Sequence, residues 1–253
     1  MNKIRSRPQA LRRVVISAAV ALLLTGNSIS PAERTASTPE QAAASTAARA
    51  EDLLGQWTFD EITNSAVVEM VTGKLDALTG NYRVVTGVSG KAIKFDGYTT
   101  VVTRKAADAP KPAGAFSVSA WIALAAYPWN WCPIVSHQEE NGGYSFEIGP
   151  DGEMAMKVFT GTVWRTCISE ATLPLRAWSH VAGIFDPEAG LVIFVNGKEE
   201  GRLPFRGRMV GARRADLLIG STAAPLKPAL IHREFGTLPD FFSLDAIVDE
   251  VEI

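Results

Sequence analysis

Cysteine and histidine are scarce in this chain, which has two cysteines and three histidines among its 253 residues. A structural zinc site takes four ligands, mostly from these two residue types. Cys132 and Cys167 lie far apart in the sequence and cannot form such a site by themselves. The sequence also has no Ser/His/Asp arrangement of a hydrolase and no glycine-rich phosphate loop. These absences leave few routes to catalysis or to a transition-metal centre.

An excess of positive charge is also lacking. The chain has 25 Lys and Arg residues against 27 Asp and Glu residues, a net charge of −2. Removal of the N-terminal leader described next would leave 20 basic residues against 27 acidic ones, a net charge of −7, because that leader holds Lys3, Arg5, Arg7, Arg12 and Arg13. Phosphate binding requires concentrated positive charge, so a nucleic-acid partner is not expected.

Long hydrophobic runs are absent except for Val14 to Leu24, which is short for a membrane span. This run follows a basic segment and precedes a polar stretch with small residues at Ser30 and Ala32, the pattern of a cleaved signal peptide. We therefore expect residues 1–32 to direct export, as in a bacterial protein that is periplasmic, cell-surface or extracellular. An uncleaved anchor is the alternative, and Arg12-Arg13 leaves the twin-arginine route open. No further membrane span is expected.

Helical periodicity is nearly absent from the remainder. Residues 33–52, rich in Ala, Ser, Thr and Pro, are expected to form a flexible linker. From Leu53 onward, short apolar or alternating segments are separated by Gly, Pro, Asn and Asp, which is typical of all-β folds. A short helix is expected only at Ser65–Val71. Strands are expected at Gly55–Asp60, Lys91–Phe95, Thr99–Thr103, Phe116–Ala123, Pro133–His137, Tyr144–Ile148, Met154–Phe159, Val163–Ser169, Trp178–Asp186, Leu191–Val195, Asp216–Ile219 and Ala246–Glu252.

The expected strands alternate in polarity. The strand that begins near residue 116 has an apolar face and a mostly polar face, which carry Phe116, Val118, Ala120 and Ile122 against Ser117, Ser119 and Trp121. This period of two is expected of antiparallel strands with one buried face. A dozen such strands within about 200 residues require two sheets packed face to face. The sequence therefore predicts an all-β fold, a two-sheet antiparallel β-sandwich, over residues 53–253.

Several segments also arrive in a recognisable order. They are Trp57–Glu61, Gly87–Gly97, Phe116–Ile122, Trp178–Asp186 with the hairpin that ends at Asn196-Gly197, Leu218–Gly220 and Asp249–Val251. Together they resemble the laminin-G-like, or concanavalin-A-like, jelly-roll family over nearly all of the chain from Leu54. The resemblance implies a jelly-roll sandwich that serves mostly as a sugar- or partner-binding module and less often as an enzyme. It also implies that Trp57, Trp121 and Trp178 lie in the core.

Export bears on Cys132 and Cys167, because disulfides persist in oxidising compartments. In the expected hairpin order, two strands separate the strands of these cysteines, and at about 4.8 Å per strand the gap is too wide for a direct bridge. Cys132 precedes its strand, however, so its loop could fold over and close the gap. The sequence leaves the disulfide open.

A loop rich in aromatic residues is the main candidate for ligand binding. Tyr127-Pro128-Trp129-Asn130-Trp131 places three rings beside an amide, and aromatic planes with adjacent polar groups suit the apolar faces and hydroxyls of sugar rings. The alternative is that Trp129 and Trp131 fold back and seal the edge of the sandwich. With residues of neighbouring strands added, the predicted ligand-binding set is Trp129, Asn130, Trp131, Tyr144, Trp164 and Arg165.

No catalytic constellation is convincing. Retaining glycosidases of this fold carry a Glu-x-Asp-x-x-Glu arrangement on one strand. The nearest match is interrupted by Pro and Gly of a hairpin turn, and its residues are Glu147, Asp151 and Glu153. A lyase of this fold would need a Tyr, His and Arg or Gln set for proton abstraction, for which the candidates are His137, Gln138, Tyr144 and Arg165. The lyase motifs are not recognisable around these residues, so we expect no enzyme activity.

The family resemblance implies calcium as the metal to consider. Relatives often hold one Ca²⁺ with carboxylates and backbone carbonyls that join the first and last strands, and hard oxygen ligands suit that ion. The matching carboxylates are Asp60, Glu61 and Asp249. The alternative is that they cap strand ends or are simply solvated.

The sequence thus predicts an exported, non-catalytic carbohydrate-binding or adhesion-type module whose partner is a polysaccharide or glycoconjugate. One alternative is an accessory module or fragment of a glycoside hydrolase, which acts with a catalytic partner domain or protein. Another is a structural or protein-interaction domain without a sugar ligand. Function resides in the site carried by a fold rather than in the fold itself, so the site residues have to decide among these.

Overall fold

Residues 53–223 and 244–253 are described by the structure, a computed structural model. The predicted signal peptide (residues 1–32), its anchor alternative and the linker (residues 33–52) lie outside the described residues. Within the described ranges the regular secondary structure consists of strands. No helix in this part of the chain is long and apolar enough to cross a membrane.

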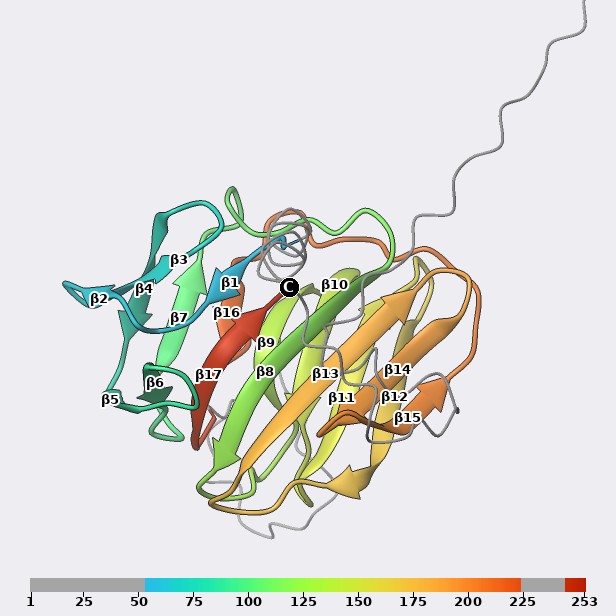
Figure 1. Cartoon of the computed structure of the whole chain (residues 1–253). Coiled ribbons are helices and arrows are strands. Elements are labelled where there is room, and N and C mark those ends of the chain that lie inside the picture. Colours follow the sequence, from blue (N-terminus) through green and yellow to red (C-terminus); the bar gives the residue numbers. More distant parts are fainter. Residues whose placement is uncertain (1–52, 224–243) are drawn as a thin grey trace, which may run out of the picture.

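The strands form two sheets that lie face to face, with sheet A in front of sheet B in Figure 1. Sheet A has the order β15-β14-β13-β8-β17-β6-β5, and β1 pairs with β17. Its strands are β1 (Gln56–Trp57), β5 (Arg83–Thr86), β6 (Lys91–Lys94), β8 (Phe116–Leu124), β13 (Trp178–Asp186), β14 (Gly190–Val195), β15 (Lys198–Leu203) and β17 (Ala246–Glu252).

Sheet B has nine strands in the order β12-β11-β10-β9-β16-β7-β4-β3-β2. These are β2 (Ile62–Thr63), β3 (Ala66–Glu69), β4 (Lys74–Thr79), β7 (Val101–Arg104), β9 (Cys132–Glu139), β10 (Gly142–Ile148), β11 (Glu153–Phe159), β12 (Trp164–Thr172) and β16 (Leu217–Ile219). All strand pairs of both sheets are antiparallel. The predicted two-sheet antiparallel sandwich is confirmed.

Each expected strand overlaps an observed one, but the expected helix at Ser65–Val71 is wrong. Ala66–Glu69 is strand β3 and pairs with both β2 and β4. Asn64 and Ser65 have φ angles of 50° and 58° and turn the chain between β2 and β3. Val67 is buried in the core and Glu69 is buried against Arg104, so tertiary contacts outweigh a weak local pattern.

The core lies between the two sheets and follows the expected alternation. In β8, Val118, Ala120 and Ile122 are buried and belong to the main hydrophobic cluster. Trp57 is fully buried, as expected. The expectation for the other two tryptophans is wrong: Trp121 and Trp178 are half-buried and alternate with core residues, so they lie on the outer side of sheet A.

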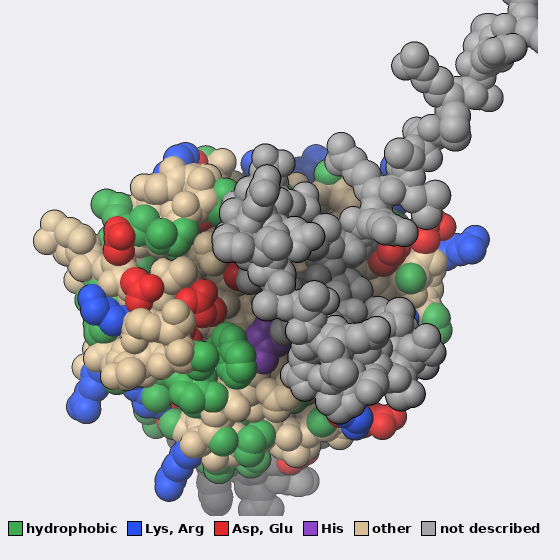
Figure 2. Space-filling view, viewed as in Figure 1, with side chains coloured by type: hydrophobic (Ala, Val, Ile, Leu, Met, Phe, Trp, Pro, Cys, Tyr) green, Lys and Arg blue, Asp and Glu red, His purple; other side chains and the backbone are tan. Residues whose placement is uncertain are grey.

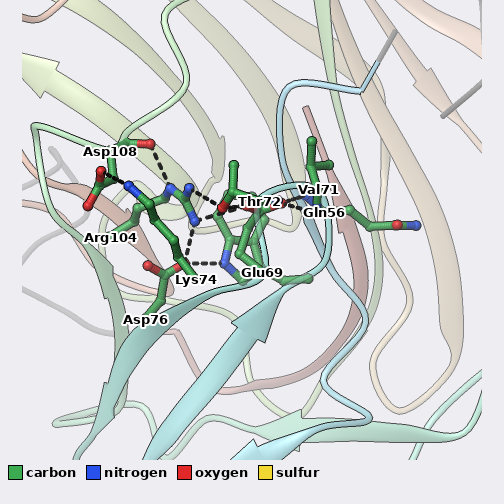
Figure 3. Close-up of polar contacts among 9 residues, drawn as sticks. Gln56, Glu69, Val71, Thr72, Lys74, Asp76, Arg104 and Asp108 are labelled. Carbon is green, nitrogen blue, oxygen red and sulfur yellow. Dashed lines mark hydrogen bonds and ion pairs between the residues drawn. The ribbon is translucent and has the colours of Figure 1, made fainter. Parts of the chain in front are cut away.

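A buried ionic network joins β1, β3, β4 and β7 beside the core (Figure 3). Glu69 Oε2 and Asp76 Oδ2 each lie 3.1 Å from Nη1 of Arg104, and all three side chains are at most 5% exposed. Arg104 Nε donates to the carbonyl of Asp108 at 2.8 Å, and Nη2 donates to the hydroxyl of Thr72 at 2.9 Å. We call these residues, with Trp57, the Arg104 network.

The two carboxylates of the Arg104 network respond differently to burial. Burial raises the pKa of Asp76, and bonds from Trp57 Nε1 (2.7 Å) and Arg104 offset this only in part. Burial acts in the same direction on Glu69, but the Thr72 hydroxyl and three backbone N–H groups outweigh it and hold the pKa of Glu69 below its ordinary value. The fold therefore favours the ionised form of Glu69 more strongly than that of Asp76.

Charged side chains are dispersed on the face of the molecule seen in Figure 2. Lys and Arg side chains lie apart from one another around the margin of this face, with acidic side chains among them. Several basic residues are paired with carboxylates, such as Lys105 with Asp216 at 2.9 Å and Arg202 with Glu199 at 2.5 Å. The expectation that the chain has no nucleic-acid partner stays a prediction.

Candidate functional site

The face of sheet B that points away from the core carries a row of polar side chains. Ser136, Ser145, Lys157 and Thr166 lie opposite one another across β9, β10, β11 and β12. Their neighbours in sequence, such as Tyr144, belong to the core cluster between the sheets. Because successive residues of a strand point to opposite sides, this row lies on the side of sheet B away from the core, although Ser136 and Ser145 are themselves buried there. We call it the outer face of sheet B.

Trp131 contacts this row through the side chain of Lys157. The Lys157 ammonium group is 5.5 Å from the centroid of the Trp131 ring, within the range of a cation–π contact. The same ammonium group is 2.5 Å from Oε2 of Glu147, whose side chain is only 1% exposed. Trp131 itself is half-buried. One ring, one ammonium group and one carboxylate therefore meet on the outer face of sheet B.

The loop before β9 holds Trp129 out into solvent. The Tyr127 hydroxyl donates to the carbonyl of Leu173 at 2.9 Å, and the buried Asn130 accepts the backbone N–H of Trp131 on its Oδ1 at 2.9 Å. Between Tyr127 and the buried Asn130, Trp129 is 58% exposed. In the expected alternative, both tryptophans fold back and seal the edge of the sandwich. This alternative describes the half-buried Trp131 in part and is wrong for Trp129.

The other predicted binding residues lie elsewhere. Tyr144 pairs with His137 and Val158, four residues along β10 from the end at which Ile148 pairs with Cys132, a run of about 13 Å. Tyr144 is fully buried and points between the sheets. The predicted set therefore separates into Trp129, Asn130 and Trp131 at one end of these strands and Tyr144, Trp164 and Arg165 at the other.

Trp164 and Arg165 also point to different sides of β12. Trp164 is half-buried, its indole N–H donates to the carbonyl of Glu140 at 3.3 Å, and its ring centroid lies 5.5 Å from that of Phe159. Arg165 is exposed, with its guanidinium carbon 5.4 Å from the centroid of the Phe205 ring. Trp164 has the parity of Thr166, so it shares the outer face of sheet B with Trp131.

The centre of the outer face of sheet B is closed by hydrogen bonds that the sequence did not indicate. Gln138 Nε2 donates to the hydroxyl of Thr222 at 3.0 Å, and the Ser136 hydroxyl lies 3.2 Å from the same oxygen. Lys157 was also missed as a site residue. The available signal was the alternation of Met156, Lys157 and Val158, which turns the lysine outward in the run 154–159, where the other residues are apolar.

The structure does not assemble the catalytic sets considered from the sequence. Glu147 lies in β10, within the strand expected at Tyr144–Ile148, where it is buried and paired with Lys157 rather than grouped with Asp151 and Glu153. Asp151 and Glu153 do lie at the turn, where Glu153 Oε2 accepts the Asp151 N–H at 3.0 Å. His137 and Tyr144 are neighbours, but Gln138 points to the opposite face and Arg165 is exposed.

A family comparison adds to this geometry. The laminin G family model, described as the Concanavalin A-like lectin/glucanases superfamily, matches residues 95–231, more than half of the chain. The chain belongs to this superfamily. The matched range includes β8 to β16 and with them the outer face of sheet B. In a comparison with curated protein sequences, nothing matches.

Solved structures with this fold are similar over about four fifths of the chain. Domain 4 of AbnA, a GH43 extracellular arabinanase from Geobacillus stearothermophilus in complex with arabinotriose, has a TM-score of 0.58 and 15% identity, over 79% of this chain and 90% of that one. The binding domain of Paraclostridial Mosquitocidal Protein 1 has a TM-score of 0.57 and 12% identity, over 80% and 48%.

A structure of botulinum neurotoxin type C, whose cell entry depends on interaction with two ganglioside molecules, has a TM-score of 0.56 and 11% identity, over 82% of this chain and 49% of that one. The chain thus spans about half the length of the two toxin structures. At these identities the likeness shows the shared fold and leaves the ligand of this superfamily member to its own residues.

The carboxylates matched to calcium sites of the superfamily are engaged by backbone N–H groups. Asp249 Oδ2 accepts Val88 N–H at 2.8 Å and Ser89 N–H at 3.1 Å, and Asp60 Oδ1 accepts Lys91 N–H at 2.8 Å. Burial, with the nearby Asp60 charge as a smaller cause, raises the pKa of Asp249. A Cβ atom at Gly87 would lie 2.3 Å from Asp249 Oδ2, so glycine there lets the carboxylate approach the turn.

These contacts favour capping of the 87–91 turn over metal binding. The Lys91 ammonium group donates to the Asp60 carbonyl at 3.1 Å, which places a positive charge beside that oxygen, and Glu61 is exposed. Among the described residues no group of three or more His, Cys, Asp or Glu side chains is arranged to hold a metal ion. The residues fit a calcium ion poorly, and calcium stays a prediction.

Cys132 and Cys167 are buried thiols on β9 and β12. Strands β10 and β11 lie between them, as the expected hairpin order required. Burial raises the pKa of both thiols, that of Cys167 to about 11. Cys132 and Cys167 are not joined by a disulfide in the structure.

Proposed function

We propose that this chain is a non-catalytic carbohydrate-binding module that holds a glycan against Trp129 and Trp131. The observation that carries the proposal is Trp129, an indole ring that is 58% exposed on a loop that the Tyr127 hydroxyl ties to the carbonyl of Leu173. An indole side chain has only two χ angles, so it loses little conformational entropy on binding, and most of the contact energy is available for the ligand.

The chemistry around Trp131 suits a sugar ring. The C–H face of a pyranose or furanose stacks on an indole plane, and its hydroxyls need donors and acceptors at the ring edge. Lys157, whose side chain is 25% exposed, supplies an ammonium donor beside Trp131, and the buried Glu147 carboxylate holds that ammonium group in place at 2.5 Å. Hydrogen bonds to charged groups are stronger than those between neutral groups, which favours orientation of the bound hydroxyls.

The similar structures support this ligand class. One is an arabinanase domain in complex with arabinotriose, and another belongs to a toxin whose cell entry depends on gangliosides. The chain covers 90% of the arabinanase domain, which supports the second candidate, an accessory module of a glycoside hydrolase. Export through the predicted signal peptide at residues 1–32 is part of the proposal, since extracellular glycans are the accessible partners.

A glycan array probed with the full chain, in calcium buffer and in EDTA, tests the proposal. The array includes arabino-oligosaccharides, sialylated glycans and plant and bacterial polysaccharides. We expect saturable binding to at least one glycan class, with no product released from it. Silence across all glycans by folded protein would contradict the proposal, and release of shortened glycan would contradict the non-catalytic part alone. Binding that needs an added hydrolase domain would favour the accessory-module candidate.

A further inference from the structure

A cavity of about 200 Å³ lies beside the adjacent ends of β9 and β10, distant from Trp129 and Trp131. Two loops close it, residues 110–112 before β8 and residues 209–213 before β16. Its walls are mostly apolar and are formed by Pro110, Pro112, Met209 and Ala212. An apolar cavity of about 150 Å³ is enough to bind benzene in another protein, so this one has room for a substituted ring.

Two buried polar groups line this cavity without a partner. Tyr144 is fully buried and His137 is 2% exposed, and the two rings meet edge to face with their centroids 5.7 Å apart. Neither the Tyr144 hydroxyl nor His137 Nε2 has a hydrogen-bond partner among the described residues. Most buried side-chain polar atoms in folded proteins are hydrogen-bonded, so two exceptions in one cavity call for a ligand group that completes them.

The protonation states of the two groups follow from their surroundings. Burial lowers the pKa of His137, and its ring also bonds the backbone at Ala215, which leaves Nε2 of the neutral ring as an acceptor. The charged groups that act on the ring are Lys111, Glu139 and Asp216. Burial raises the pKa of Tyr144, so its hydroxyl remains a donor. Both polar atoms are closed to solvent in the structure, so the side chains that cover them must shift before a single ligand hydroxyl can accept from Tyr144 and donate to His137.

The lining of the cavity also includes two cations. Lys111 and Arg213 line it and are exposed, and no ion pair joins either of them to a carboxylate within residues 53–223 and 244–253. The Arg213 loop is held to the end of β9, because the Glu139 carboxylate accepts the backbone N–H groups of Arg213 and Arg214 at 3.0 and 3.3 Å. The exposed part of the cavity lining therefore carries two positive charges, and the loop of one of them is held in place. The buried part carries two polar atoms without a hydrogen-bond partner among the described residues.

We infer that this cavity binds a small hydroxy-carboxylate with an apolar body, the class represented by 4-hydroxybenzoate. The ligand hydroxyl bridges Tyr144 and His137, the ring lies between Pro110 and Met209, and the carboxylate lies between Lys111 and Arg213. The site is separate from the tryptophans of the proposed glycan site and does not depend on that function. A glycan without an apolar ring would not bury the apolar walls of the cavity.

Calorimetric titration of the full chain with 4-hydroxybenzoate and with benzoate tests the inference. We expect 4-hydroxybenzoate to bind with a Kd of about 1 mM or tighter and at least about tenfold tighter than benzoate, because only the hydroxyl satisfies the buried pair. In Tyr144→Phe we expect the two acids to bind within about threefold of each other. Phenylalanine keeps the ring and its packing, so this variant retains the fold.

A second pair of variants tests the cationic rim. Arg213→Gln should weaken both acids by about three- to tenfold, and Arg214→Gln, whose side chain does not line the cavity, should leave both unchanged. The inference is overturned by the absence of saturable binding up to about 10 mM, by an equal affinity for the two acids, or by a preference that persists in Tyr144→Phe. It is also overturned if glucuronate, which has the carboxylate and hydroxyls but no apolar ring, binds more tightly. None of these outcomes depends on glycan binding.

Discussion

The Arg104 network and the Tyr144 cavity are two buried polar clusters in one sandwich, and they differ in one respect. In the network, the three guanidinium nitrogens of Arg104 reach two carboxylates, a hydroxyl and a carbonyl at 2.8 to 3.1 Å. In the cavity, the Tyr144 hydroxyl and His137 Nε2 have no partner among the described residues. Both clusters are buried, but only in the Arg104 network do the described residues supply hydrogen-bond partners for the buried polar groups.

The difference separates a structural role from a binding role. A buried charge that is fully paired holds strands together and becomes costly only when one partner is removed. A buried polar group that is left unpaired weakens the fold, so its retention points to a use outside folding. The network therefore explains how β1, β3, β4 and β7 are held together, and the cavity marks a place for a ligand.

The largest expected effect comes from breaking the network at its centre. Arg104→Met leaves Glu69 and Asp76 buried without their cation and should lower the free energy of unfolding by about 3–5 kcal/mol. Denaturation with urea measures it. Lys105→Met is the matched control, because the neighbouring Lys105 pairs with Asp216 at the surface and should cost about 1 kcal/mol or less. Similar losses of unfolding free energy in both variants would show that the buried ion pairs of the network stabilise the fold no more than the surface pair does.

Removal of one hydroxyl from each cluster sharpens the comparison. Thr72→Val removes a hydroxyl that donates to Glu69 and accepts from Arg104, and should cost about 1–2 kcal/mol. Tyr144→Phe removes a hydroxyl without a described partner and should leave the stability unchanged or raise it by about 1 kcal/mol. Thermal and urea unfolding of both variants measure the two effects. A loss in Tyr144→Phe as large as that in Thr72→Val would mean that the cavity is already satisfied.

The pH dependence of the network is a smaller effect with a defined sign. The pKa of Glu69 is lowered in the folded protein, so Glu69 contributes stability above its ordinary value of 4.5 and loses that contribution as the pH falls. The difference in unfolding free energy between the wild type and Glu69→Gln should therefore shrink between pH 7 and pH 3. Glu188→Gln, at a side chain that is 79% exposed, should show no such trend. A difference that stays constant with pH would contradict the role of Glu69.

The smallest expected effect concerns calcium. Because Asp60 and Asp249 already bind the backbone of the 87–91 turn, EDTA should leave the Tm unchanged. Differential scanning calorimetry with EDTA, and again after added calcium, measures this directly. A fall in Tm that calcium reverses would support the calcium prediction and would show that the turn reorganises around the ion.

Strands with strict alternation and strong turns could be predicted from the sequence, and weakly patterned ones could not. Trp178–Asp186 is observed with the expected bounds, and Asn196 and Gly197 adopt the positive φ angles, 50° and 78°, that their hairpin requires. Lys198–Leu203 was missed because its sequence is mostly polar, and it becomes a strand through its pairing with β14 at the edge of sheet A. Pairing across a sheet is not encoded in the local pattern.

The candidate site was predictable only in part. The aromatic loop was found from its composition, but the sequence left open whether Trp129 is exposed or seals the edge, and it did not indicate that Trp131, just before β9, contacts Lys157 on β11. Tyr144 was grouped with the tryptophans although it lies two residues from the core residue Phe146, on the same side of an alternating strand. That alternation was the available signal that Tyr144 points inward, toward the cavity rather than toward the outer face of sheet B.

The most direct measurement is the affinity of tryptophan variants for the best glycan of the array. Trp129→Ala combined with Trp131→Ala should weaken binding by about thirtyfold or more, as expected when aromatic anchors are lost. Tyr98→Ala, which removes an aromatic side chain that is 74% exposed elsewhere, should bind as the wild type does. Wild-type affinity in the double tryptophan variant would contradict the proposed glycan site.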